Sequence, residues 1–457
     1  MNNWKVCLIN DSFPPTIDGV ATAVRNYARI ISENLGSAAV VTPFYPDVDD
    51  SVHPFPVYRY PSMMLSKKVG YRAGIPFSPE LMGKMQEERF DLLHSHCPIS
   101  STLLARALRE QLDLPLVLTY HTKFDVDIAN AVRGKLVQEE LIRLLVRNIS
   151  ACDEVWTVSR GAGENLRSLG FEGSYVVMPN GVDFPRGRVT EREIEAVTGD
   201  YDLPAGVPVL LFVGRMMWYK GIRIILDALK SLDDEGKDFR MVFVGGGGDQ
   251  EEILSYAESL RMGNKLIFVE PIRDRERIRA WYCRGDLFLF PSTFDTNGLV
   301  VREAAACALP SVLVRGSCAA EDVADGETGF LIEENAPSLA QTLRRLLEQP
   351  ELVRRVGEET QRDLYLSWED AVSNAWQGYG AVIDNYRRGL YQKPRHSADE
   401  AFHNLGGLMD WLNRLDLHKV AVEYRGRTWS FEEILTLISR SKDPRDPLSR
   451  QRTDRFL

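Results

Sequence analysis

Residues 287–306, LFLFPSTFDTNGLVVREAAA, give the clearest indication of the fold. Leu287–Phe290 is a short and wholly apolar run, which is typical of a strand buried on both faces of a sheet. A polar loop follows it, and Gly298 then opens a run of residues that we predict to be a helix. The stretch is therefore predicted as strand, loop and helix, which is the repeating unit of a parallel sheet.

The same alternation of short apolar runs and helical patterns extends through most of the chain. The predicted strands lie at 6–9, 39–41, 92–93, 116–118, 155–158 and 175–177, and then at 209–213, 241–244, 266–269, 287–290, 311–314 and 329–332. Between the two series, residues 183–208 are polar and rich in Pro and Gly, and we predict a linker there. The pattern predicts an α/β fold with two Rossmann-like halves, each a doubly wound parallel sheet.

Composition excludes several classes of protein. A chain of 457 residues, 44% hydrophobic and 26% charged, can form two or three globular domains. Its net charge of −10 lacks the basic footprint typical of nucleic-acid binding. The six cysteines are scattered without a CxxC pair, which indicates reduced thiols in the cytoplasm. No apolar run approaches the ~20 residues that span a bilayer, so we predict that any membrane contact is peripheral.

The strongest group of candidate functional residues surrounds the helix predicted to begin near Gly298. The first N–H groups of such a helix are unpaired and its dipole favours an anion there. Asp295 precedes this helix and Glu303 lies within it. A carboxylate accepts two hydrogen bonds, which suits the paired hydroxyls of a ribose or a hexose.

A second group follows the strand predicted at 209–213. Arg215 and Lys220 lie five residues apart, before a helix. We expect a fixed guanidinium and a mobile ammonium, which together can clamp a diphosphate.

Three further stretches follow predicted strands or lie at the hinge. Asp18 and Gly19 open a helix after the first strand, which is again a position that suits an anion. Residues 120–122, Tyr-His-Thr, follow the strand at 116–118, and strand ends of this kind line the ligand crevice of open α/β sheets. Residues 179–183, PNGVD, lie at the predicted hinge between the halves.

Taken together in this order, the motifs resemble those of family 4 retaining glycosyltransferases, which have the GT-B fold. The resemblance covers about residues 4–390. The matching motifs are DGVA (18–21), HSH (94–96), YHT (120–122), SRGA (159–162), PNGVD (179–183), GR and KG (214–215 and 220–221), the Asp295–Glu303 pair and DGETGFL (325–331).

This resemblance implies two Rossmann-like domains that face a central cleft. Residues 1–185 would form an N-terminal acceptor domain, and residues 186–370 a C-terminal domain that binds a nucleotide-sugar donor. Helices at 371–394 would return to the N-terminal domain, and 395–457 would be a small basic extension.

The resemblance also implies a role for each matching residue. Arg215 and Lys220 would bind the donor diphosphate and stabilise it as it leaves. Glu303 would hold the ribose hydroxyls, Asp295 would contact the transferred sugar, and His121 would lie over that sugar, near the acceptor. Backbone N–H groups would reach the phosphates from Gly19, Gly298, Leu299 and Val300.

The implied reaction retains the sugar configuration and uses no metal and no cofactor besides the donor. The acceptor hydroxyl would attack from the face that the diphosphate leaves. This chain departs from the family pattern at Asp295, where a Glu is usual, and at Asn297, where an aromatic residue is usual. The DTNG version resembles most closely the members that glycosylate lipids.

The acceptor region is predicted from charge and apolar residues together. Residues 62–77 mix apolar side chains with Lys67, Lys68 and Arg72, which suits a segment at an anionic lipid surface. The helix at 133–147 is also partly basic and partly apolar. An ordinary loop and an ordinary core helix would explain both stretches equally well.

The sequence therefore predicts a cytoplasmic enzyme, peripheral on the inner face of the membrane. It would move a hexose, with UDP-glucose as the first candidate donor, to a lipid hydroxyl such as that of diacylglycerol or a glycolipid. The alternatives are a soluble sugar or polysaccharide acceptor, a GT-B phosphorylase or epimerase, and a non-catalytic GT-B binding protein.

Three minor features complete the prediction. The spacing of His94 and His96 would suit a metal, but packing at a strand end is the preferred interpretation. The glycines at 245–248 lack the dinucleotide spacing and predict a tight turn near the base. Residues 420–433 predict strand, turn, strand and a helix capped by Ser430 and Glu433. This last stretch weakly resembles the opening of acyl-adenylating enzymes, and we give it no enzymatic role.

Overall fold

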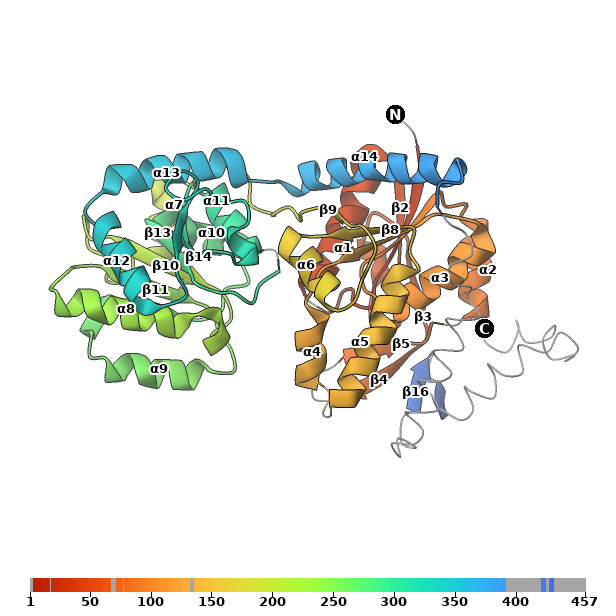
Figure 1. Cartoon of the computed structure of the whole chain (residues 1–457), viewed down its shortest axis with the longest axis horizontal. Helices are drawn as coiled ribbons and strands as arrows, with labels where there is room; N and C mark the ends of the chain where they lie inside the picture. Colours follow the sequence, from red (N-terminus) through yellow and green to blue (C-terminus); the bar gives the residue numbers. More distant parts are fainter. Residues whose placement is uncertain are drawn as a thin grey trace, which may run out of the picture. The chain divides into compact units, whose positions relative to one another are not determined.

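The structure, a computed structural model, describes residues 3–16, 18–66, 71–76, 78–131, 135–296, 298–391, 421–424 and 427–430. The chain forms two compact units. Unit 1 takes in residues 1–158, 162–178 and 372–457, and unit 2 takes in residues 159–161 and 179–371. Each unit contains its own parallel sheet (Figure 1), which confirms the predicted α/β class with two Rossmann-like halves.

Unit 1 contains a seven-stranded sheet in the order β3-β2-β1-β6-β7-β8-β9, and every neighbouring pair is parallel. The chain builds outward from β1 on one side and then returns to add β6 beside β1. The topological switch point therefore lies between β1 and β6, where open sheets of this kind bind ligands. The strands are β1 (Lys5–Ile9), β2 (Ser37–Pro43), β3 (Val57–Tyr60), β6 (Leu92–Ser95), β7 (Leu116–Tyr120), β8 (Glu154–Thr157) and β9 (Val176–Val177).

The central strands β1 and β7 of unit 1 are mostly apolar, and all their residues except Lys5 are buried, as their sequences predict. The first predicted helix is α1 (Gly19–Ile30), which continues as a π-helical turn (Ile31–Leu35). The other helices of this unit are α2 (Pro79–Glu87), α3 (Ser100–Leu112), α4 (Phe124–Ala131), α5 (Lys135–Ser150), most of α6 (Arg160–Ser168) and most of α14 (Trp368–Arg387).

Unit 2 contains a six-stranded parallel sheet in the order β12-β11-β10-β13-β14-β15. Its switch point lies between β10 and β13. The strands are β10 (Val209–Val213), β11 (Arg240–Val244), β12 (Leu266–Val269), β13 (Leu287–Phe290), β14 (Ser311–Val314) and β15 (Phe330–Ile332). All six were predicted from their apolar runs, and β10, β12, β13 and β14 have the predicted bounds.

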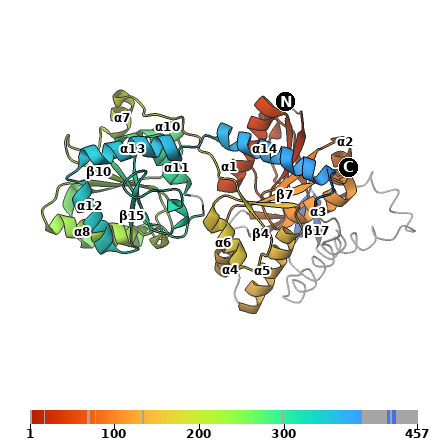
Figure 2. The same cartoon turned by 45° about the horizontal axis from the view of Figure 1, so that its top comes forward.

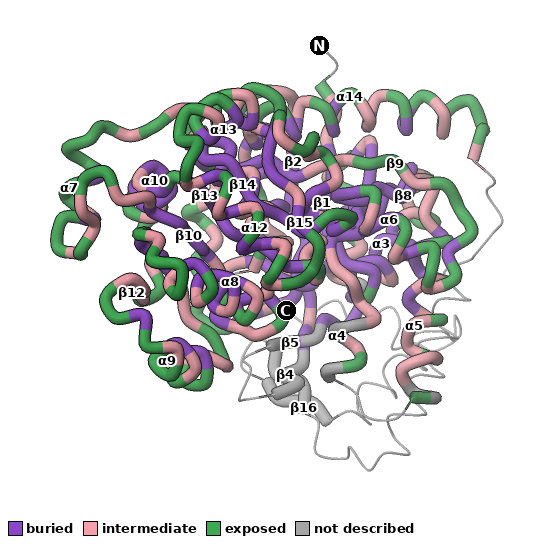
Figure 3. Tube along the Cα trace, turned by 60° about the vertical axis from the view of Figure 1, so that its left-hand side comes forward, coloured by how far each residue is buried: buried purple, intermediate pink, exposed green. Residues whose placement is uncertain are grey.

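Helices cover both faces of the unit 2 sheet. α8 (Ile222–Asp234) and α12 (Ala336–Leu346) pack together on one face, with α9 (Gln250–Ser259) beside α8. The other face carries α10 (Arg275–Arg284), α11 (Leu299–Ala306) and α13 (Pro350–Leu364) (Figure 1). Figure 3 shows the central strands β10, β11 and β13 of this sheet as buried, whereas the edge strand β12 is mostly of intermediate burial and α9 mixes buried with exposed residues.

The predicted linker at 183–208 was wrong in part, because it contains helix α7 (Glu191–Thr198). Thr190 and Glu193 form a reciprocal capping box at its start, which satisfies backbone N–H groups that would otherwise be unpaired. Ile194 is buried in the core of unit 2, where α7 packs against α10. The Pro and Gly residues on either side obscured this short amphipathic helix.

Helix α14 joins unit 1 although it comes late in the chain, and it lies with the elements of that unit in Figures 1 and 2. Trp376 on α14 packs on Trp4, with the ring centroids 5.2 Å apart. Trp156 of β8 stacks on Tyr379, also on α14, at 5.2 Å. These aromatic contacts fix the returning helix to the sheet of unit 1.

A separate antiparallel sheet has the order β17-β16-β4-β5. β4 (Ser62–Ser66) and β5 (Tyr71–Gly74) were not predicted, whereas β16 (Ala421–Tyr424) and β17 (Arg427–Ser430) confirm the predicted pair of strands near the C-terminus. Val422 lies opposite Met63, which connects the two hairpins. The helix predicted after Ser430 lies outside the described residues.

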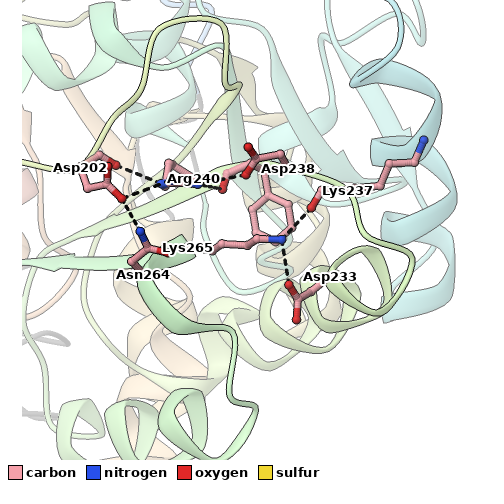
Figure 4. A network of polar contacts seen from close by, with 8 residues as sticks. Asp202, Asp233, Lys237, Asp238, Arg240, Asn264 and Lys265 are labelled. Atoms are coloured by element: carbon pink, nitrogen blue, oxygen red, sulfur yellow. Dashed lines mark hydrogen bonds and ion pairs between the residues drawn. The ribbon is translucent and has the colours of Figure 1, made fainter.

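A polar network at the amino end of two neighbouring strands stabilises unit 2 (Figure 4). Arg240 begins β11 and donates to the backbone oxygen of Asp202 at 3.0 Å and to carboxylates of Asp202 and Asp238, both at 3.1 Å. Lys265, just before β12, donates to Asp233 and to the backbone of Lys237, both at 2.8 Å. The network is at the opposite edge of the sheet from the carboxyl ends of the strands, so we assign it a structural role.

Candidate functional site

The unit 2 candidates lie in the loops that follow β10 and β13, the two strands at the switch point. Arg215 and Lys220 follow β10, and Asp295 follows β13. Gly221 shows how closely these loops pack, because a Cβ there would stand 2.2 Å from the backbone oxygen of Pro291. Its φ of +76° is a second reason for glycine. The loop geometry therefore brings Lys220 and Asp295 together.

Lys220 and Asp295 form a direct ion pair. Lys220 Nζ lies 2.5 Å from Asp295 Oδ1, and Ser292 Oγ donates to Asp295 Oδ2 at 2.6 Å. The Lys220 side chain is 8% exposed and that of Asp295 is 23% exposed. Both carboxylate oxygens of Asp295 therefore have a hydrogen-bond or ion-pair partner. Because the Asp295 side chain is partly exposed, a ligand can still reach it.

The expectation of a fixed guanidinium and a mobile ammonium was wrong, since the two cations have the opposite environments. Lys220 is buried, and its Nζ also lies 5.6 Å from the centre of the Phe290 ring and 5.5 Å from that of Tyr219. Arg215 is exposed, with its guanidinium 5.9 Å from the Tyr219 ring. The site therefore combines one positioned ammonium with one guanidinium that is open to solvent.

Helix α11 begins at the predicted position. Gly298 is its N-cap residue and has φ +54°, and a Cβ there would stand 2.9 Å from Cβ of Ala319. Leu299 and Val300 form the first turn, where backbone N–H groups have no partner within the helix. Asn297 lies outside the described residues.

Glu303 lies on α11 and is 9% exposed. Arg275 Nη2 donates to its Oε1 at 2.6 Å, and the Tyr282 hydroxyl donates to its Oε2 at 2.9 Å. Tyr282 is buried, and its pKa is raised well above the usual value by burial and by the nearby Glu303 carboxylate. The Arg275 side chain is 42% exposed and its guanidinium lies 4.4 Å from the Phe184 ring centre. The Glu303 carboxylate is thus oriented by one buried and one exposed donor.

Sequence reasoning missed Arg275, Tyr282 and Ser292. The first two lie on α10, which packs beside α11. No local spacing connects them with Glu303, which is 28 residues after Arg275. Ser292 lies three residues before Asp295 in the same loop, and this spacing could have predicted a hydrogen bond from its hydroxyl to the carboxylate.

In unit 1, the predicted start of α1 is confirmed. Asp18 caps the helix by accepting from the N–H of Ala21 at 2.7 Å. Gly19 is the first helical residue, and no described atom lies within 4 Å of the position that a Cβ would take there. Asp11, in the preceding loop, is buried and accepts from the N–H of Ser101 at 2.8 Å, so it connects this loop to α3.

His121 directly follows β7 and is buried, with 6% of its surface exposed. Its Nε2 lies 3.0 Å from Nδ1 of His96, which follows the neighbouring strand β6. Burial lowers the pKa of His121 to about 3, so the imidazole is neutral at physiological pH.

The alternative interpretation of His94 and His96 as metal ligands does not fit His94. Its Nδ1 lies 2.6 Å from the Tyr379 hydroxyl and its Nε2 lies 2.7 Å from Oγ1 of Thr119. Both ring nitrogens already have protein partners, which agrees with the preferred interpretation as packing at a strand end.

One cation of the predicted lipid-facing segment does not face solvent. Arg72 is 1% exposed, and its Nε donates to Oγ of Ser62 at 2.8 Å. Lys67 and Lys68 lie outside the described residues. Within the part of the chain that the structure describes, no helix is long and apolar enough to cross a membrane.

Comparison with known proteins agrees with this geometry. Residues 17–186 match the model of Glycosyltransferase Family 4, and residues 194–363 match that of Glycosyl transferases group 1. Among solved structures, the chain resembles HepE from Anabaena, solved with UDP-glucose. The TM-score is 0.63 at 18% identity, and the match covers 84% of this chain and 100% of that one.

Three curated relatives also resemble the chain over most of its length. Sulfoquinovosyl transferase SQD2 of Arabidopsis thaliana is 27% identical over 81% of this chain and 72% of its own. Alpha-monoglucosyldiacylglycerol synthase of Streptococcus pneumoniae is 23% identical over 67% of this chain and 70% of its own. D-inositol 3-phosphate glycosyltransferase 2 of Catenulispora acidiphila is 28% identical over 66% of this chain and 74% of its own.

Two Rossmann-like units, with candidate residues at the switch point of each sheet, define a protein of the GT-B fold class. The chain belongs to glycosyltransferase family 4. It is accordingly a transferase of glycosyl groups.

Proposed function

We propose that this glycosyltransferase moves glucose from UDP-glucose to a lipid hydroxyl, with retention of configuration and without a metal ion. The observation that carries the proposal is the arrangement around α11. Lys220 and Asp295 lie before its first turn, and Glu303 lies within it. A cation, free N–H groups and two carboxylates are the groups that a nucleoside diphosphate sugar requires.

The diphosphate is the part of the donor that gains charge as the sugar leaves. In this proposal Lys220, Arg215 and the N–H groups of Gly298, Leu299 and Val300 bind it. Lys220 and these N–H groups are positioned before the reaction, so they need little reorganisation when the charge develops. They supply the stabilisation that other transferases obtain from a divalent cation.

Glu303 is proposed to bind the two hydroxyls of the ribose. Its Oε1 is held by the half-exposed Arg275, and its Oε2 by the buried Tyr282. A ribose diol that approaches Oε1 takes the place of Arg275, while Tyr282 keeps the carboxylate in orientation. Asp295 is proposed to accept hydrogen bonds from the transferred sugar.

The transfer forms one bond and breaks one bond at the anomeric carbon. The acceptor oxygen bonds to this carbon on the face from which the diphosphate oxygen departs, and the hydroxyl proton passes to that phosphate oxygen. We assign the diphosphate and ribose of the donor to unit 2, and acceptor binding to unit 1. Gly19 and His121 of unit 1 are proposed as additional contacts to the donor.

The lipid acceptor is supported by one of the relatives. The protein from Streptococcus pneumoniae is named for making a glucosylated diacylglycerol. Peripheral contact with the inner face of the membrane belongs to the same proposal. Because Arg72 is buried, such contact would rest on other residues.

A soluble acceptor is the second candidate. The relative from Catenulispora acidiphila is named for transfer to D-inositol 3-phosphate and is 28% identical, against 23% for the diacylglycerol-related protein. The two candidates share the donor site and differ only in what unit 1 binds.

Calorimetric titration with UDP and with GDP, both in EDTA, tests the donor site. We expect UDP to bind more tightly, and we expect the Glu303→Ala variant to lose this binding. An acceptor screen then compares diacylglycerol vesicles with inositol phosphate and free sugars. Binding of neither nucleotide to folded protein would contradict the proposal, and transfer to a soluble acceptor alone would favour the second candidate.

A further inference from the structure

The contact between His96 and His121 is a feature of unit 1 that the proposed function does not explain. The two residues follow β6 and β7, which are adjacent parallel strands. His96 Nδ1 lies 3.0 Å from His121 Nε2, with the ring planes 27° apart and the ring centroids 5.3 Å apart. His96 is 1% exposed, so this contact is shielded from water.

Only one hydrogen can lie between the two nitrogens, so the contact couples the tautomers of the two rings. Burial lowers the pKa of both His96 and His121, so both rings are neutral and each carries one proton. If His121 Nε2 donated, the proton of His96 would lie on its own Nε2. If His96 Nδ1 donates, the proton of His121 lies on Nδ1.

The environment of His96 Nε2 decides between these states. This atom is buried and has no hydrogen-bond partner among the described residues. A buried N–H without an acceptor is rarer in proteins than an acceptor that lacks a donor. The favoured state therefore leaves His96 Nε2 without a proton and places the shared proton on His96 Nδ1.

We propose that His96 is a positioning residue that keeps His121 in the neutral tautomer protonated on Nδ1. His121 is then a hydrogen-bond donor through Nδ1 and cannot serve as a base through Nε2, which accepts from His96. The effect of this tautomer on sugar transfer rests on the proposed function. The tautomer itself is a property of unit 1 and does not depend on a bound nucleotide sugar.

His94 offers a matched control within the same cluster. Its ring centre lies 3.9 Å from that of His96, but its own nitrogens pair with Tyr379 and Thr119. A substitution at His94 removes buried hydrogen bonds and leaves the His96–His121 contact in place. Loss of stability and loss of tautomer control can therefore be separated.

The test compares His96→Asn with His96→Gln in the full-length protein. The Asn amide reaches the position of Nδ1 and can still donate to His121, whereas the Gln amide reaches the position of Nε2. Ring ¹⁵N shifts of histidine-labelled protein report the tautomer directly. The chain has only seven histidines, and a His121→Gln spectrum identifies the signals of His121.

We expect His121 to be protonated on Nδ1 in the wild type and in His96→Asn, and to change tautomer in His96→Gln. In glucosyl transfer, His96→Gln should lower kcat by about 10- to 100-fold with UDP affinity unchanged, while His96→Asn stays within about threefold. His94→Gln should lower the unfolding temperature and leave the tautomer of His121 as it is.

A wild-type His121 protonated on Nε2, or equal spectra and kcat for the Asn and Gln variants, would overturn the inference. If the wild type shows no transfer activity at all, the proposed function fails, while the nitrogen shifts still decide the tautomer.

Discussion

Lys220 Nζ lies 2.5 Å from Oδ1 of Asp295, although the two residues are 75 positions apart in the chain. They come from the loops after β10 and β13, the strands on either side of the switch point. Parallel strands that meet at a switch point leave a gap between the loops at their carboxyl ends. The ion pair therefore marks the place in unit 2 where a phosphorylated ligand is expected.

Lys220→Met should lower kcat/KM for transfer by about 100- to 1000-fold, because it removes a preorganised positive charge from the leaving diphosphate. Steady-state kinetics with UDP-glucose measures the effect. Lys237→Met is the matched control, since Lys237 is a surface lysine that pairs with Glu348 at 2.5 Å. If Lys220→Met and the control variant were both fully active, the assignment of Lys220 to the donor site would be contradicted.

Glu303→Ala should abolish the preference for a ribonucleotide. In the wild type we expect UDP to bind about tenfold or more tightly than 2′-deoxy-UDP, because the carboxylate accepts from the ribose hydroxyls. The variant should bind both weakly and equally, as measured by calorimetry. If Glu303→Ala still prefers UDP over 2′-deoxy-UDP, the ribose binds elsewhere. Tyr282→Phe keeps the Glu303 carboxylate and should reduce this preference only in part.

The fold was predictable because the strands are short apolar runs separated by polar loops. Val209–Val213 and Leu266–Val269 were identified within their observed bounds. The loops that follow the strands were predictable for the same reason, since strand ends carry the ligand site in such folds. β3 was missed because only its last residue, Tyr60, is buried, so its sequence lacks the apolar signal.

The partners of the site residues were not predictable in the same way. The contact of Arg275 with Glu303 depends on how α10 packs against α11, and no spacing in the sequence encodes that packing. The contact of His96 with His121 was easier to predict, because the two residues directly follow adjacent strands. Which side chains of two such loops touch is decided by backbone geometry beyond the strand ends.

Arg240→Ala should lower the free energy of unfolding of unit 2 by about 2–3 kcal/mol without changing UDP affinity. The Arg240 side chain is 8% exposed and donates to Asp202 and Asp238 (Figure 4). Removing it leaves a buried gap and breaks charge-assisted hydrogen bonds. Denaturant unfolding and nucleotide titration measure the two quantities, and a loss of UDP affinity in the folded variant would contradict the structural role.

As the pH is lowered, the stability of unit 1 should begin to fall at pH values above those at which carboxylates usually titrate. Burial lowers the pKa of His94, His96 and His121, so the unfolded chain binds more protons than the native state below about pH 6.5. Stability therefore falls as the pH falls, by about 1.4 kcal/mol per histidine for each pH unit. The groups around this cluster are the neutral side chains of Tyr27, Trp156, Tyr379 and Thr119.

Denaturant unfolding at pH 7.5 and pH 5.5 measures this dependence. His94→Gln should reduce it, because one of the three buried imidazoles is removed. Equal stability at the two pH values would show that these histidines titrate normally in the native state.

Analysis of the product formed from UDP-glucose and diacylglycerol vesicles, in EDTA, tests the central claim most directly. NMR of the anomeric proton identifies the linkage, and the released UDP is measured in the same reaction. The proposal predicts an α-linked glucosyl lipid and UDP in equal amounts, with both formed about 100- to 1000-fold more slowly by Lys220→Met. A β-linked product would contradict retention, and a folded protein that releases no UDP with any acceptor would contradict glucosyl transfer.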